Sequence, residues 1–168
     1  MITEPDRVLN ELEIIQNPAL GAFSVWQFAL GYQDEAGLSV PFPLAFLVLP
    51  LLLHKPTLDA IGSTRKASGL ALFAAKLAAQ REDLLAVHER ALLLRPLTLQ
   101  ALGLGVTARL IKIEYETAGL RAFPLEPGSK KPTLPERLKS FAAASDKLGY
   151  WFYKAGLQQV AVALRVDF

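Results

Sequence analysis

The stretch LIKIEYETAGLRAF, residues 110–123, sets the fold class of the chain. Apolar and polar residues alternate over residues 110–115, which is the period of a half-buried strand. Residues 117–119 (Thr-Ala-Gly) can form a turn, and apolar residues resume over residues 120–123. Two such runs joined by a short glycine-containing turn predict a β-hairpin.

Three helical patterns precede this hairpin. Apolar residues recur three and four positions apart after Ser68, between residues 81 and 95, and between residues 98 and 109. We expect Pro96 to end the second helix and Thr98 to cap the third. The residues expected to face inward are Leu70, Phe73, Ala74 and Leu77, then Leu84, Leu85, His88, Ala91 and Leu92, then Leu99, Leu102 and Val106.

The order helix, helix, helix, hairpin over residues 68–125 is that of a winged helix. The predicted fold class is therefore mainly α with a small β-hairpin, a winged-helix-like helical domain. An unclassified helical fold is the alternative. At 168 residues we expect a single domain over residues 1–168.

An apolar helical part, residues 17–56, is expected before the winged-helix-like part. Asn17 and Pro18 are typical of a helix start, and Gly31 is expected to end that helix. From Pro43 an almost wholly apolar, proline-interrupted segment follows, which predicts a buried, kinked helix. Residues 57–67 are expected to connect it to the next part.

C-terminal helices are expected over residues 133–168. Thr133 and Glu136 fit a capping box for a long helix, and Gly156 is expected to break it before a short closing helix. At the other end of the chain, residues 5–16 fit either a helix or an extended arm.

Composition favours a protein that binds other proteins. Hydrophobic residues make up 52% of the chain and the mean hydropathy is +0.28. One small core cannot hide all of this, so an exposed apolar patch is expected. The net charge of +2 is too small to indicate nucleic acid by itself.

The expected location is the cytoplasm, without a membrane span. Cysteine is absent, and the N-terminal sequence lacks the basic and apolar regions of a secretory signal. The most hydrophobic stretch, residues 38–53, is interrupted by Pro41, Pro43 and Pro50, and a span needs about 20 apolar residues.

No catalytic, cofactor or metal site is predicted, so the chain is not expected to be an enzyme. Residues 62–66 (Gly-Ser-Thr-Arg-Lys) lack the Gly-Lys-Ser/Thr ending of a phosphate loop. Residues 103–108 match a dinucleotide fingerprint, but they lie late in a helix and precede a strand. Gly103 and Gly105 are better interpreted as sites of close helix packing. His54 and His88 have no metal-ligand spacing.

Two candidate surfaces follow from the sequence. The aromatic run at residues 150–153 points all round its helix, and with the apolar segment it supplies the residues expected to bind a partner. Basic connectors supply possible DNA phosphate contacts, although solvated loops are the simpler interpretation. The partner-binding candidates are Tyr150, Trp151, Tyr153, Leu47 and Leu51, and the DNA candidates are Lys55, Arg65, Lys66, Lys130 and Lys131.

Several short motifs carry a resemblance to a known family. They are residues 17–21 (Asn-Pro-Ala-Leu-Gly), residues 49–56 (Leu-Pro-Leu-Leu-Leu-His-Lys-Pro), residues 64–66 (Thr-Arg-Lys) and residues 148–151 (Leu-Gly-Tyr-Trp). In this order, and with the hairpin, the chain resembles the middle component proteins of three-component ABC-ATPase systems. The motifs are short, but the resemblance spans nearly the whole chain.

The resemblance implies a non-catalytic accessory subunit without a cofactor. Its partners would be an SMC-like or Rad50-like ATPase and an effector, in bacterial anti-phage defence of the Lamassu kind, with ATP hydrolysis in the ATPase and DNA contact through the complex. No functional residue carries over from the family. The alternative function, suggested by the residues themselves, is a winged-helix DNA-binding regulator.

Overall fold

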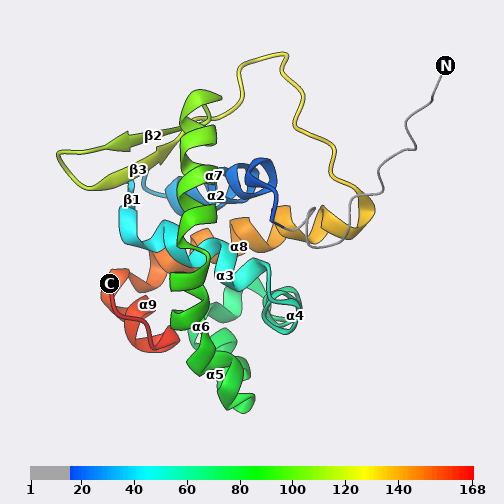
Figure 1. Ribbon diagram of the computed structural model, residues 1–168, viewed down its shortest axis with the longest axis vertical. Coiled ribbons are helices and arrows are strands. Elements are labelled where there is room, and N and C mark those ends of the chain that lie inside the picture. The colour runs from blue at the N-terminus through cyan, green and yellow to red at the C-terminus, as the bar shows by residue number, and fades with distance from the viewer. Residues whose placement is uncertain (1–15) are drawn as a thin grey trace.

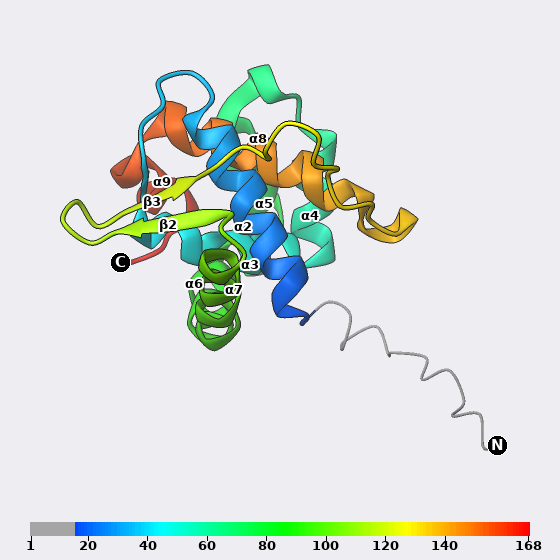
Figure 2. The ribbon, with the colours of Figure 1, turned by 90° about the horizontal axis from the view of Figure 1, so that it is seen from above.

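The computed structural model describes residues 16–168, except for the side chain of Arg137, and is mainly helical with one small sheet (Figures 1 and 2). The residues 5–16 segment lies almost wholly outside this range. The elements are α2 (Pro18–Gln33), β1 (Val40–Pro41), the 3₁₀ helix η1 (Phe42–Leu47), α3 (Val48–Leu52), α4 (Lys55–Ser63), η2 (Lys66–Ser68), α5 (Gly69–Ala79), α6 (Arg81–Leu93), α7 (Arg95–Thr107), β2 (Ile111–Glu114), β3 (Gly119–Ala122), η3 (Glu136–Leu138), α8 (Lys139–Ala155) and α9 (Leu157–Leu164).

Helix α2 is the centre of the fold. It is buried on nearly every side, with α8 packed across it, α7 beside it and the hairpin near its C-terminal end. A helix that is apolar all round suits this position. The predicted start is confirmed, since the side chain of Asn17 accepts a hydrogen bond from the Ala19 N–H at 2.8 Å. The predicted end at Gly31 is wrong, because the helix continues to Gln33.

Gly31 has a different role, which it shares with Gly149 of α8. A Cβ at Gly149 would lie 2.1 Å from the carbonyl oxygen of Phe28, and one at Gly31 would lie 2.4 Å from that of Asp146. Real Cβ atoms essentially never come within 3.0 Å of another heavy atom in this way. The two helices therefore touch backbone to backbone where they cross.

The aromatic run at residues 150–153 packs around this crossing. Because α8 lies between α2 and α5, Trp151 and Phe152 are buried in the core. Tyr150 and Tyr153 are half-buried. The ring partners, at centroid distances of 5.4–5.5 Å, are Phe73 for Trp151, Phe28 for Phe152 and Tyr32 for Tyr153. The Trp151 indole N–H also donates to the carbonyl of Lys66 at 2.8 Å.

The apolar segment after Pro43 is buried, as predicted, but it bends after Leu52 and not at Pro50, which lies inside α3. It forms η1 and α3, which lie against α2, α6 and α8. The expected connector over residues 57–67 is wrong, since most of it is helix α4 followed by η2. Lys147 holds the end of α4, because its ammonium donates to the carbonyls of Ile61 at 2.9 Å and Thr64 at 2.8 Å.

The predicted hairpin is confirmed. β2 and β3 pair antiparallel with Ile113 opposite Leu120, and β1 adds a third strand on the far side of β3 that the sequence did not indicate. Gln33 at the end of α2 fastens the sheet, because its side chain donates to the carbonyl of Ala122 at 3.0 Å and accepts from the N–H of Ala122 at 2.7 Å.

The winged-helix arrangement is not confirmed. A helix-turn-helix needs its two helices at about 90–120°, whereas α6 and α7 run on almost in line (Figures 1 and 2). Pro96 lies in the first turn of α7 and does not end α6 before a loop. Thr98 is a buried residue inside α7, so its predicted capping role is wrong.

The predicted capping box at Thr133 and Glu136 is also wrong. α8 begins at Lys139 after η3, and its first residues receive no side-chain cap. The break at Gly156 is confirmed: its φ of 82° lies in a region that favours glycine, and α9 starts at the next residue.

Among the described helices, none alone has the length and hydropathy to cross a membrane. Phe42–Leu52 and Lys55–Ser63 meet those criteria only as a pair, by length and composition, and they are bent by 102°.

The glycine crossing gives a stability prediction. Gly149→Ala should lower the free energy of unfolding by about 3 kcal/mol, because the new methyl group overlaps the backbone of α2. Urea unfolding followed by circular dichroism measures this.

Gly103→Ala in α7 is the matched control, since its Cβ would meet nothing within 4 Å. It should raise the free energy of unfolding by about 0.5–1 kcal/mol through helix propensity. Equal effects of the two substitutions would contradict the close crossing.

Candidate partner-binding surface

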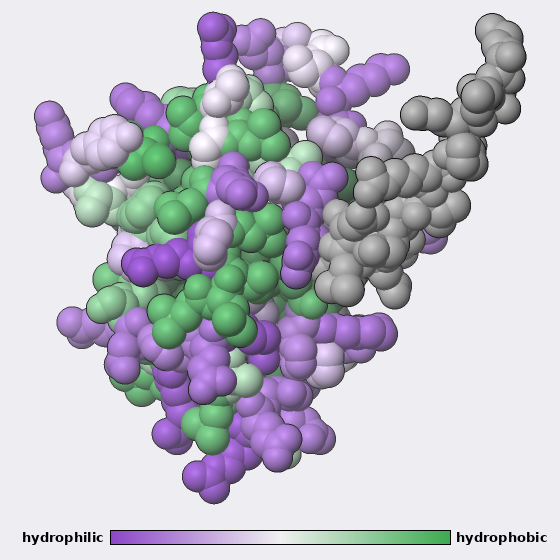
Figure 3. Space-filling view, in the orientation of Figure 1, coloured by the Kyte–Doolittle hydropathy of each residue, from purple (hydrophilic) through white to green (hydrophobic). Residues whose placement is uncertain are grey.

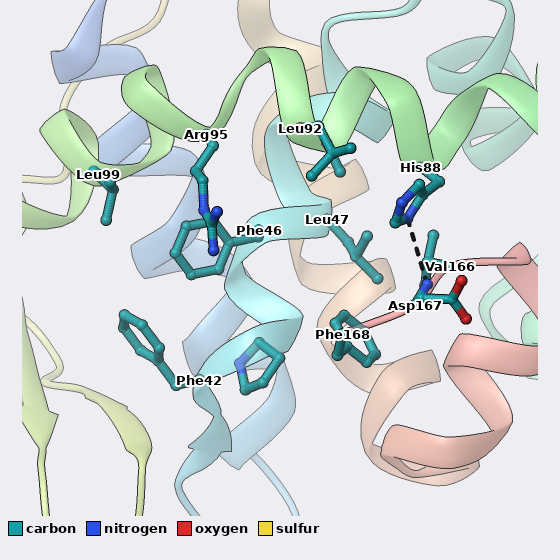
Figure 4. A pocket seen from close by; sticks show the side chains of 12 residues that line it. Phe42, Phe46, Leu47, His88, Leu92, Arg95, Leu99, Val166, Asp167 and Phe168 are labelled. Atoms are coloured by element: carbon teal, nitrogen blue, oxygen red, sulfur yellow. Dashed lines mark hydrogen bonds between the residues drawn. The ribbon is translucent and has the colours of Figure 1, made fainter.

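An open apolar groove of about 600 Å³ lies between η1, the joint of α6 and α7, and residues 166–168 (Figure 4). In Figure 4 the side chains of Leu99, Arg95, Leu92 and His88 extend from one side of the α6–α7 helices toward the groove. The lining residues are Phe42, Pro43, Phe46, Leu47, His88, Ala91, Leu92, Arg95, Leu99, Val166, Asp167 and Phe168.

The groove exposes large apolar side chains to solvent. Leu92 is 56% exposed, Leu99 51% and Phe168 55%. The sequence prediction that Leu92 and Leu99 face inward is therefore wrong, as it is for Leu85 and Val106, whereas Leu84 and Leu102 are buried as predicted. Each helix has two apolar faces. The face that the core buries carries Leu84 and Val87 on α6 and Ala101 and Leu102 on α7.

The polar groups of the groove are few. The Arg95 guanidinium lies over the ring of Phe46, at 5.9 Å from its centroid. His88 Nδ1 accepts a hydrogen bond from the N–H of Asp167 at 3.4 Å, which holds residues 166–168 against α6. Such a lining can bind an apolar surface and one anionic group, but it offers no converging nucleophile, base and acid.

A second apolar hollow of about 700 Å³ lies where the loop after β3 passes over the start of α2. Leu125 and Leu134 of that loop contribute to its wall, and Lys131 of the same loop lies over the Phe23 ring at 5.9 Å. The chain's own loop already covers this hollow in part, so the groove at α6 and α7 is the better candidate for a partner.

Three of the predicted partner-binding residues are inside the core. Leu47 and Trp151 are 1% exposed and Leu51 is 0% exposed, so the expectation that they project from the surface is corrected, although Leu47 contributes to the wall of the groove. They are buried because other helices of the chain cover η1, α3 and α8. Tyr150 and Tyr153 are half-buried, and their role in binding remains a prediction.

The predicted DNA-contacting residues form two separate groups. Lys55 is the first residue of α4, and Arg65 and Lys66 follow the end of that helix, with Lys66 beginning η2. Lys130 and Lys131 lie in the loop that crosses the top of the molecule in Figure 1. The structure does not bring the two groups together.

Two of these lysines already have carboxylate partners. Lys55 pairs with Asp59 at 3.3 Å, and Lys66 pairs with Asp146 at 3.1 Å and lies over the Tyr150 ring at 4.8 Å from its centroid. Arg65 and Lys130 are exposed.

A polar cluster at the start of α4 was not predicted. His54 Nδ1 lies 2.8 Å from Thr57 Oγ1, and His54 Nε2 lies 3.6 Å from a carboxylate oxygen of Asp83. Arg90 approaches the same hydroxyl at 3.4 Å. The order Thr, His, Asp is that of a catalytic triad, but Thr57 is 0% exposed, so no substrate reaches its hydroxyl. The cluster fastens α4 to α6.

Within the described residues, no group of three or more His, Asp or Glu side chains could hold a metal ion. Of the two glycines in the dinucleotide-like stretch, both predicted to pack closely, only one does so. Gly105 packs closely, with a Cβ there 2.9 Å from Ile111, whereas Gly103 faces open space.

An exposed apolar groove of this kind is typical of a domain that binds another protein. Over residues 6–168 the chain matches the family described as ABC-three component (ABC-3C) system Middle Component 3, and it belongs to that family. No curated protein and no solved structure matches the chain. The family resemblance expected from the sequence is thus confirmed: the chain is a middle component, whose family name implies work with the other components of such a system.

The polar cluster gives a prediction for pH. Burial, followed by the charge of Arg90, lowers the pKa of His54 below its usual 6.5, and Asp83 opposes this only in part. Between the two pKa values the unfolded chain binds more protons than the folded chain. The share of stability due to His54 is therefore complete above pH 6.5 and declines as the pH falls below it.

Urea unfolding of the protein and of His54→Gln at about pH 5 and pH 7.5 should show a smaller loss at low pH in the variant. An NMR titration of the His54 ring gives the pKa directly. A pKa at or above 6.5 would contradict the stated environment.

Proposed function

We propose that the chain is a non-catalytic accessory subunit of a bacterial anti-phage defence complex, in the cytoplasm. In this proposal it binds an SMC-like or Rad50-like ATPase and an effector, and ATP hydrolysis belongs to the ATPase. The observation that carries the proposal is the exposed apolar groove at α6 and α7 in a member of a middle component family.

The energetics of the groove support binding to another protein. Leu92, Leu99 and Phe168 each stay about half exposed. Complete burial of such a side chain contributes about 1.5–3 kcal/mol, so covering the three adds several kcal/mol to association. A partner that also meets Arg95 gains orientation from a charged contact near the middle of the groove.

The alternative, a winged-helix DNA-binding regulator, has less support. The exposed part of α7, which would be the recognition helix, carries Leu99, Leu104 and Val106, and its one basic side chain, Arg95, lies at the first residue of the helix over the Phe46 ring. Two of the five basic candidates are engaged by carboxylates of the chain itself.

Co-expression tests the proposal. The full chain, tagged and produced with the ATPase and effector encoded beside it, should co-purify with them and elute as one complex at micromolar concentration. Size-exclusion chromatography with light scattering measures this. A chain that stays monomeric in the presence of both components would contradict the proposal.

The same preparation tests DNA binding. If the isolated chain shifts duplex DNA at low salt, and Arg65→Ala with Lys130→Ala abolishes the shift, the regulator alternative gains support over the subunit proposal. We expect no shift by the isolated chain.

A further inference from the structure

Four exposed apolar side chains recur at every seventh position along α6 and α7. Leu85 is 49% exposed, Leu92 56%, Leu99 51% and Val106 42%. Seven residues are close to two helical turns, so these side chains follow one line, which we call the α6–α7 seam. A seven-residue apolar repeat is the pattern by which one helix packs lengthwise against another.

The seam crosses the joint between the helices because α6 and α7 form nearly one rod. The Leu94 N–H donates to the carbonyl of Arg90, and the Thr98 N–H donates to that of Leu94, each at 2.9 Å. Figures 1 and 2 show the two helices in line, and Figure 3 shows apolar side chains gathered along this face. The rod is about 40 Å long at 1.5 Å per residue.

A second line of side chains with the same spacing borders the seam. It consists of Arg81, His88 and Arg95, of which the two arginines are exposed. Among the described residues no carboxylate forms a salt bridge with Arg95. Arg81 and Arg95 make this edge of the seam positive at two points, with Asp167 beside His88, so an occupant complements Arg95 with an acidic side chain.

The same charge argues against a second copy of this chain. Two antiparallel copies that overlapped the full seam would pair Leu92 of each copy with Leu99 of the other. The two Arg95 guanidinium groups would then meet at the two-fold axis without a carboxylate between them. Like charges placed together oppose association.

We propose that the α6–α7 seam is the docking surface for an amphipathic helix of another component, with apolar residues seven apart and acidic residues along the flank that faces Arg95. This inference rests on the proposed function and specifies how the subunit would hold its partner.

The test uses the complex of the full chain with the ATPase and effector. Leu92→Asp and Leu99→Asp should each weaken the complex by about tenfold or more, because a desolvated charge replaces an apolar contact. Leu93→Asp is the matched control: Leu93 neighbours Leu92 but lies off the seam and is 78% exposed, so little change is expected. Circular dichroism verifies that all variants fold.

The charged edge is tested in the same assay. Arg95→Glu should weaken the complex more than Arg95→Gln does, and the difference should shrink at high salt. A photoreactive amino acid at position 99 should crosslink to a partner segment that has the seven-residue apolar repeat and acidic flank.

The failures can be told apart. If the unmodified chain forms no complex, both the proposed function and this inference are overturned. If the complex forms and the seam variants bind as tightly as Leu93→Asp, only the seam is overturned. A crosslink between two copies of this chain, or to a segment without the apolar repeat, overturns the choice of occupant.

Discussion

The close crossing of α2 and α8 is the contact on which the rest of the structure depends. Gly31 and Gly149 remove the side chains that would otherwise hold the two backbones apart. Around that point the Phe28–Phe152 and Tyr32–Tyr153 pairs fill the remaining space with rings. A wider crossing would separate these rings.

The crossing also decides what lies on the surface. Because α8 covers one side of α2 and places Trp151 against Phe73 of α5, Trp151 and Phe152 of the aromatic run are buried in the core. α7 packs beside α2 at Gly21, where an added Cβ would lie 2.8 Å from Ala101, so α7 turns Ala101 and Leu102 inward. The opposite face of the α6–α7 rod, with Leu85, Leu92, Leu99 and Val106, then stays largely exposed in the described part of the chain.

The sequence predicted the elements better than their faces. The Asn17 cap, the alternation in residues 110–115 and the break at Gly156 act locally, so their outcomes could be predicted. The burial of an amphipathic helix depends on its neighbours. Apolar spacing in α6 and α7 fitted two faces, and the predicted inward set mixed them: Leu84 and Leu102 are buried, whereas Leu92 and Leu99 are exposed. Gly31 suggested a helix end because its actual role, a close contact with the backbone of α8, involves residues far away in the sequence. The local pattern could not predict that contact.

The central claim is that a helix of another component covers the apolar face of the α6–α7 rod. A cryo-electron microscopy reconstruction of the assembled complex tests it most directly. The account predicts helical density lying along Leu85, Leu92, Leu99 and Val106, with these side chains buried. A complex in which this face points into solvent would contradict it.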